Sequence, residues 1–153
     1  MNQPTLQKRT MLALALTGVV LAAAGCSMLD QQSSLVAFTT QLRGGNEVPP
    51  VASNATGSVD AVLDKNTNLL RWKVSYAGLS GPATAGHFHG PAAVGANAGV
   101  VLGWKGPMSA SMEGNATITP AQAADLIAGK WYANIHTAAH PGGEIRGQMT
   151  ARY

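Results

Sequence analysis

The sequence contains a single cysteine, and it has few charged and few aromatic side chains. Of its 153 residues, 11% are charged and 5% are aromatic. One cysteine excludes an intramolecular disulfide, so an apolar core has to stabilise the fold. Clusters of Lys and Arg interleaved with aromatic residues are also missing, which argues against a nucleic acid as a partner.

The first 25 residues have the features of an export signal. Lys8 and Arg9 form a short positive region, and the chain from Met11 to Ala24 is uncharged and apolar or small. Small residues then precede Cys26, as at a signal-peptide cleavage site. The apolar stretch is shorter than the roughly 20 residues that a membrane-spanning helix needs.

The segment from Leu21 to Cys26 resembles the lipobox of bacterial lipoproteins, although Ala23 stands where Leu is usual. In that motif the cysteine is lipidated and becomes the first residue of the mature chain. Ser27 follows the cysteine in place of Asp, and in Gram-negative lipoproteins this implies an outer membrane anchor facing the periplasm. The alternative is an ordinary signal peptide with an incidental cysteine.

We therefore predict three segments: a signal peptide over 1–25, a lipidated Cys26 with a flexible tether over 26–35, and one domain over 36–153. The acyl chains would attach this domain to the membrane. Removal of the signal takes away two basic residues and none of the seven acids, so the net charge falls from +3 to +1. The basic balance of the whole chain thus says nothing about a partner of the mature protein.

Short segments of alternating apolar and polar residues fill the predicted domain. The clearest is 70–76, in which Trp72, Val74 and Tyr76 occupy alternate positions, as in a strand with one buried face. A polar turn at 64–68 joins it to a second strand. The predicted strands are 36–42, 59–63, 70–76, 85–89, 99–104, 114–118, 131–137 and 144–151. This pattern predicts an all-β fold, a single antiparallel β-sandwich of Greek-key type.

One short helix is predicted near 120–128. Thr119 is a suitable N-cap, Pro120 occupies the first helical position, and Gln122 completes a capping box. Gly129 ends the helix. Because it spans barely two turns, packing against the sheet has to hold it.

The four histidines occur as two pairs, His87 with His89 and His136 with His140. Residues two apart on a strand point to the same face, with Cβ atoms roughly 6–7 Å apart. If the strands that carry the two pairs are neighbours, four imidazoles can converge on one metal ion. Imidazole nitrogen suits copper, zinc, nickel and iron. We predict a copper site, with zinc or another transition metal as alternatives.

We predict that Glu144 and Arg146, which follow the second pair in the sequence, support this site from outside the ligand set. The alternative is that all four histidines are ordinary polar residues at strand ends. A histidine can also act as a general base, but no nucleophile motif accompanies these. We therefore assign no catalytic residue.

Four motifs in register resemble the CHRD domain, the module named after chordin and common in bacterial exported proteins. The resemblance implies a β-sandwich and an extracytoplasmic setting, and it implies no enzyme activity. It carries over His87, His89, His136 and the segment 141–147, whereas His140 lies in a variable stretch between motifs. The four motifs are 42–51, 86–92, 131–137 and 141–148.

The His-x-His pair is also loosely similar to that of copper/zinc superoxide dismutase, although the zinc loop and the disulfide of that family are missing. The leading hypothesis is a lipid-anchored envelope domain that binds a transition metal through the histidines. A second hypothesis is a protein-interaction module with structural histidines, and a third is a superoxide dismutase-like enzyme.

Overall fold

The computed structural model describes residues 34–152, so the predicted signal peptide, Cys26 and nearly all of the tether lie outside the described residues. Within that range no helix is both long and apolar enough to cross a membrane. The described elements are β1 (Leu35–Arg43), the 3-10 turn η1 (Gly44–Asn46), β2 (Thr56–Asp64), β3 (Leu69–Ala77), β4 (Ala83–His89), β5 (Val100–Gly103), β6 (Ser111–Thr117), α2 (Pro120–Ile127), β7 (Tyr132–Thr137), β8 (Ile145–Gln148) and β9 (Thr150–Arg152).

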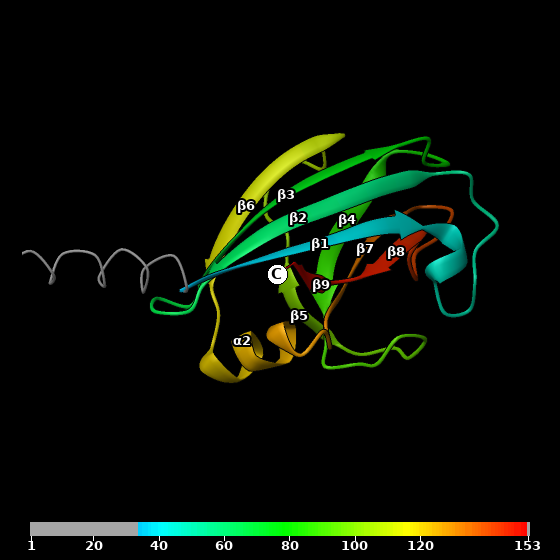
Figure 1. Cartoon of the computed structure of the whole chain (residues 1–153). Coiled ribbons are helices and arrows are strands. Elements are labelled where there is room, and N and C mark those ends of the chain that lie inside the picture. The colour runs from blue at the N-terminus through cyan, green and yellow to red at the C-terminus, as the bar shows by residue number, and fades with distance from the viewer. Residues whose placement is uncertain (1–33, 153) are drawn as a thin grey trace, which may run out of the picture.

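The strands form one antiparallel sheet with the order β5-β4-β7-β8-β1-β2-β3-β6, and β9 pairs with β1. This sheet curls strongly, so that the layer of β6, β3, β2 and β1 faces the layer of β4, β7 and β8 (Figure 1). Four strands lie between β3 and β4 in the hydrogen-bonded order, yet Trp72 on β3 meets Phe88 on β4 with ring centroids 5.4 Å apart. The two halves of one sheet therefore pack on each other as a sandwich does.

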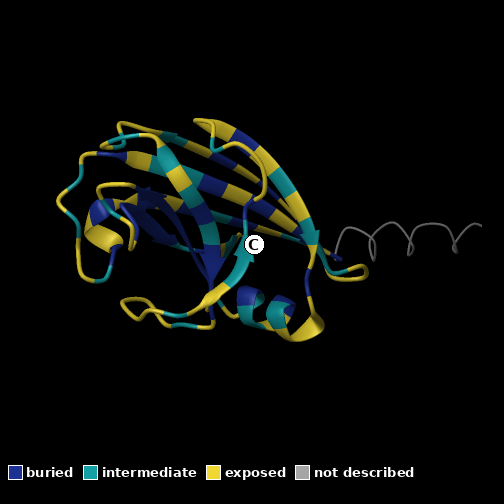
Figure 2. Ribbon diagram, turned by 180° about the vertical axis from the view of Figure 1, so that it is seen from behind, coloured by how far each residue is buried: buried dark blue, intermediate teal, exposed yellow. Residues whose placement is uncertain are grey.

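The core lies between these two halves. Phe88 is fully buried and also contacts the rings of Trp104 and Trp131. Gly86 precedes it by two residues, and a Cβ atom there would clash with the Trp104 ring. Buried and exposed residues alternate along β2 and β3, in the layer opposite β4 and β7, as Figure 2 shows. The apolar positions of the period-two pattern thus supply this core.

The predicted antiparallel β fold with one short helix is confirmed. All eight predicted strands are present, and the last is divided at the buried Met149 into β8 and β9. The capping box of α2 is formed as predicted, since the Thr119 hydroxyl accepts from the Gln122 backbone N–H and the Gln122 side chain accepts from the Thr119 N–H. Ala123 and Leu126 turn the apolar face of the helix to the core.

Strand β7 has an unusual position, because all six of its residues are buried. It pairs with β4 on one side and with β8 on the other. One face packs into the core through Ala133 and Ile135. Loops cover the other face, which carries Tyr132, Asn134 and His136. Polar side chains are therefore buried on the side of the sheet opposite the core.

Candidate metal centre

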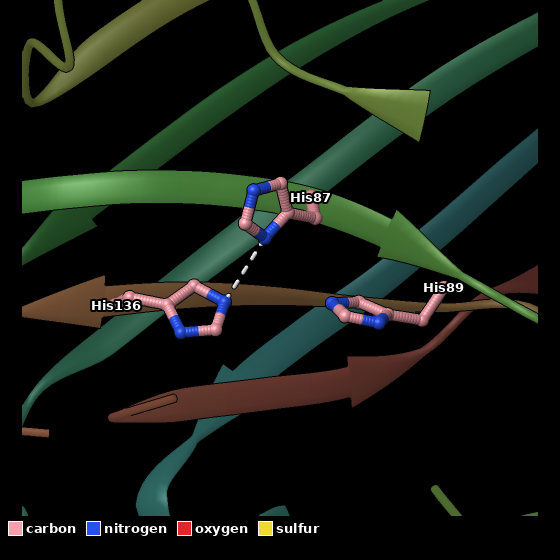
Figure 3. Close-up of side chains that lie close together, drawn as sticks. All are labelled: His87, His89 and His136. Carbon is pink, nitrogen blue, oxygen red and sulfur yellow. Dashed lines mark hydrogen bonds between the residues drawn. The ribbon is translucent and has the colours of Figure 1, made fainter. Parts of the chain in front are cut away.

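Three histidines converge on the covered face of β4 and β7. His87, His89 and His136 each offer a ring nitrogen, and these nitrogens all lie within 4.8 Å of one another. His87 Nδ1 is 3.1 Å from His136 Nε2. In Figure 3 the three rings point toward a common region between the two strands. Among the described residues, this is the one group of three or more potential side-chain ligands with such spacing.

The sheet register explains this convergence. His87 and His89 are two apart on β4, so both point to one face while Phe88 points to the core. Antiparallel pairing sets Ala85 opposite His136 and His87 opposite Asn134. The first histidines of the two pairs, His87 and His136, therefore lie diagonally across neighbouring strands. The condition for convergence, that the strands carrying the two pairs are neighbours, is therefore met.

Backbone carbonyls select the tautomer of two of the rings. His136 Nδ1 donates to the Pro141 carbonyl oxygen at 2.9 Å, and His89 Nδ1 donates to the Ala98 carbonyl oxygen at 3.0 Å. A carbonyl oxygen only accepts hydrogen bonds, so each Nδ1 carries the proton. In a neutral ring Nε2 is then the atom with a free lone pair, which is the form that ligates metal ions.

Burial favours the neutral form of these rings. It lowers the pKa of His87 below its ordinary value, and the nearby charges of protonated His136 and His89 lower it further. Burial also lowers the pKa of His136, although its bond to Pro141 opposes that change. Since a metal ion competes with protons for the ring nitrogens, both shifts extend metal binding toward lower pH.

Tyr132 and Arg146 hold the loop that positions His89. The Tyr132 ring stacks on the His89 ring with centroids 4.7 Å apart, and the Arg146 guanidinium lies 3.4 Å from the Tyr132 centroid. The Tyr132 hydroxyl donates to the same Ala98 oxygen that accepts from His89. Arg146 donates to the Ala96 oxygen, also in this loop. The predicted supporting residue Arg146 thus contacts the surroundings of His89.

Two residues that were not predicted, Asn134 and Glu47, extend the polar cluster. Asn134 Oδ1 lies 2.9 Å from Nε2 of both His89 and His136. Glu47 is 5% exposed and hydrogen-bonds to the Asn134 side chain. Burial raises the pKa of Glu47 to about 7, although the charge of Arg146 and the bond to Asn134 oppose the rise. Asn134 was open to prediction, because it shares a strand face with His136.

The other predicted supporting residue, Glu144, ties three segments together. Its buried carboxylate accepts hydrogen bonds from the Ser53 hydroxyl, the Thr137 hydroxyl, and the backbone N–H and hydroxyl of Ser80. Burial alone would raise the pKa of Glu144, but the bonds from Ser80, Thr137 and Ser53 together lower it to about 2. Glu144 thereby holds Thr137, the neighbour of His136, in place.

His140 does not join the cluster of three histidines. It is partly buried in the turn after β7, where its backbone N–H and carbonyl bond to the backbone of Thr137. Met108, Met112 and Met149 all belong to or pack against the apolar core. These methionine sulfur atoms are thus part of the core packing, and the potential metal ligands that the structure brings together are imidazoles.

The comparisons with known proteins agree with this description of the chain. The CHRD domain family model matches residues 38–149, which include β1 through β8 almost entirely and all three clustered histidines. No significant match was found among curated proteins or among solved structures.

Proposed function

This chain belongs to the CHRD domain family, and we propose that it is an envelope-anchored lipoprotein whose domain binds a transition metal ion, copper in the first place. The observation that carries the proposal is the convergence of the nitrogens of His87, His89 and His136 within 4.8 Å. Metal–nitrogen bonds of about 2.0–2.1 Å allow ligand atoms to be at most about 4.2 Å apart, so small ring movements complete the site.

The donor chemistry supports copper over the alternatives. Imidazole suits several transition metals, but Cu(II) binds a given set of nitrogen and oxygen donors more tightly than Zn(II), Ni(II) or Fe(II). Thiolates, which would favour zinc or Cu(I), are not available in the domain because Cys26 is the sole cysteine of the chain. The site would hold copper with neutral ligands, and a negative charge would come from solvent or from an exogenous anion.

The setting of the site is inferred from the sequence. The signal pattern and the lipobox-like segment ending at Cys26 support export and a lipid anchor, and Ser27 supports delivery to the outer membrane of a Gram-negative cell. A domain held at the membrane by acyl chains and able to bind copper would bind, store or detoxify the metal in the envelope. This role requires no catalytic turnover.

The decisive experiment is a copper titration of the purified full chain in mild detergent, followed by calorimetry and Cu(II) EPR. We expect one ion per chain and nitrogen hyperfine structure. The variant His87→Ala/His89→Ala should lose both, whereas His140→Ala is the matched control and should keep both. If the folded wild type binds neither copper, zinc nor nickel, the histidines are structural, and a protein-interaction module becomes the better account.

A further inference from the structure

The amide oxygen of Asn134 faces two ring nitrogens that have no proton to share with it. His89 and His136 each carry the proton on Nδ1, where a backbone carbonyl accepts it. Their Nε2 atoms therefore present lone pairs, and Asn134 Oδ1 lies 2.9 Å from both. An amide oxygen is also only an acceptor. Three lone pairs directed at one region repel one another unless a cation or a proton lies between them.

Glu47 keeps the Asn134 oxygen in this orientation. The carboxyl of Glu47 hydrogen-bonds to the Asn134 side chain, and its Oε1 lies near the Asn134 amide nitrogen, since a Cβ atom at Gly143 would crowd both. When Glu47 is ionised, rotating the amide by 180° would set its oxygen against the carboxylate oxygens and lose the N–H donor. Gly143 makes the approach possible, since a Cβ atom there would lie 2.7 Å from Asn134 Nδ2 and would clash with Glu47 Oε1. The Pro-Gly-Gly-Glu motif thus has a steric reason for its second glycine.

Three of the distances among these atoms match neighbouring ligands of one metal ion, although the cluster nitrogens as a set span up to 4.8 Å. Asn134 Oδ1 is 2.9 Å from two nitrogens, and His87 Nδ1 is 3.1 Å from His136 Nε2. With metal–ligand bonds of about 2.0–2.1 Å, such separations correspond to angles of about 90–100° at the metal. A tetrahedral site with the same bonds would separate its ligand atoms by about 3.3–3.4 Å.

We propose that Asn134 Oδ1 is the fourth protein ligand of the bound ion, and that Glu47 is the residue that positions it. The inference rests on the proposed function and deepens it, because it predicts which metal the site prefers. Three imidazole nitrogens and one oxygen at near right angles fit the tetragonal geometry of Cu(II), whereas structural zinc sites are tetrahedral. The oxygen therefore contributes to selection of copper over zinc.

The test compares Asn134→Ala and Asn134→Asp with wild type, and the exposed edge-strand variant Asn115→Ala serves as the matched control. Asn134→Ala should weaken Cu(II) binding by at least about tenfold, and it should weaken Zn(II) binding less. Asn134→Asp keeps an oxygen at the same place and should retain tight Cu(II) binding with a shifted parallel g value. An unchanged Cu(II) affinity of Asn134→Ala, or an equal loss for both metals, overturns the proposal.

If Asn134→Ala does not fold, Asn134→Asp carries the test, because replacing a neutral oxygen ligand by a carboxylate changes the donor charge at the copper ion. A Cu(II) EPR spectrum of Asn134→Asp identical to that of wild type overturns the proposal. The role of Glu47 is tested separately. Glu47→Gln keeps an acceptor for the Asn134 amide and should bind copper as wild type does, whereas Glu47→Leu should bind roughly tenfold more weakly. If the wild type does not bind copper, both proposals are wrong. If the wild type binds copper and the Asn134 variants bind it with unchanged affinity, only the inference about Asn134 is wrong.

Discussion

Strands β3 and β7 belong to the same sheet, but their surroundings differ. Along β3 buried and exposed residues alternate, so one face packs into the core while the other, with Arg71 and Lys73, meets solvent. Along β7 every residue from Tyr132 to Thr137 is buried. The two strands have similar apolar residues on the core face, and the difference lies entirely on the opposite face.

In such a fold a polar site can arise where loops cover the face of a strand that points away from the core. The outer face of β7 is covered by loops, which contribute Glu47, Ala98 and Pro141 to the polar cluster. Buried polar groups need hydrogen-bond partners or a metal ion, whereas those on β3 are solvated. On β7 the partners are the side chains and carbonyls around the three histidines. The same alternation therefore yields a solvated surface on one strand and a candidate metal centre on the other.

The largest effect on stability is expected on the core face of β7. Ile135 is fully buried, and Ile135→Ala should lower the free energy of unfolding by about 2–5 kcal/mol through lost burial and the cavity left behind. Urea denaturation monitored by tryptophan fluorescence measures this change. Copper stoichiometry of the folded fraction should be unaffected. A decrease in the free energy of unfolding below about 1 kcal/mol would show that the core around residue 135 repacks.

The next effect concerns Glu144, which bonds to Thr137 at the end of β7. Its pKa in the folded protein, about 2, lies below the ordinary value of 4.5. The charged carboxylate therefore stabilises the fold above pH 4.5, and this stabilisation disappears as the pH falls toward 2. It amounts to on the order of 3 kcal/mol.

Replacing Glu144 by Gln should remove most of this stabilisation at pH 7. Thermal unfolding between pH 2 and 7 should then be markedly less pH-dependent for Glu144→Gln than for wild type in the acidic part of the range. Identical slopes for the two proteins would mean that the carboxylate does not stabilise the fold. Asp64 also has a lowered pKa, through bonds to Asn66 and Thr67, and it remains in both proteins as an internal reference.

On the covered face, His136→Ala removes one nitrogen of the cluster. Copper affinity should fall by more than about a hundredfold, because even residues outside the ligand set cost 10–100-fold when replaced. His140→Ala should have an affinity close to that of wild type, since His140 lies outside the cluster. Competition against a chelator of known affinity measures both. Equal losses in the two variants would assign His140 to the site.

The smallest effect is expected on the solvated face of β3. Lys73 forms an ion pair of 3.5 Å with Glu113 on β6, and both side chains are well exposed. Lys73→Ala should change the free energy of unfolding by less than about 1 kcal/mol, because solvent screens the pair and the lysine stem loses little packing. Urea denaturation in low and high salt checks this. A loss comparable to that of Ile135→Ala would contradict the comparison of the two faces.

Local patterns were sufficient to predict much of the fold. The strand at 70–76 and the helix after Thr119 were predictable because alternation and capping depend on neighbours in sequence. The pairing of His87 with His89 on one face followed from the strand repeat alone. The antiparallel β class also follows from short strands separated by turns. The predicted signal peptide and Cys26 lie outside the described residues, and they stay predictions.

The composition of the site was predicted less fully. His140 was predicted as a fourth ligand, although the CHRD resemblance did not include it. Strand β7 ends at Thr137, and His140 lies in the turn that follows. Glu47 is far from Asn134 in sequence, and a loop around the 3-10 turn brings the two together. Sequence patterns carry no information on how such a loop folds over a strand.

The sequence by itself determined which residues form strands, which face of each strand is apolar, and which histidines share a face, because these properties arise from interactions between near neighbours. The tertiary structure decided the rest. The curl of the sheet brings Trp72 to Phe88, and the order of the strands makes β4 and β7 neighbours. Loop burial then sets Asn134 and Glu47 beside the histidines. Each of these features depends on contacts between segments that are distant in sequence. Such contacts form only in the folded chain, so short-range patterns do not reveal them.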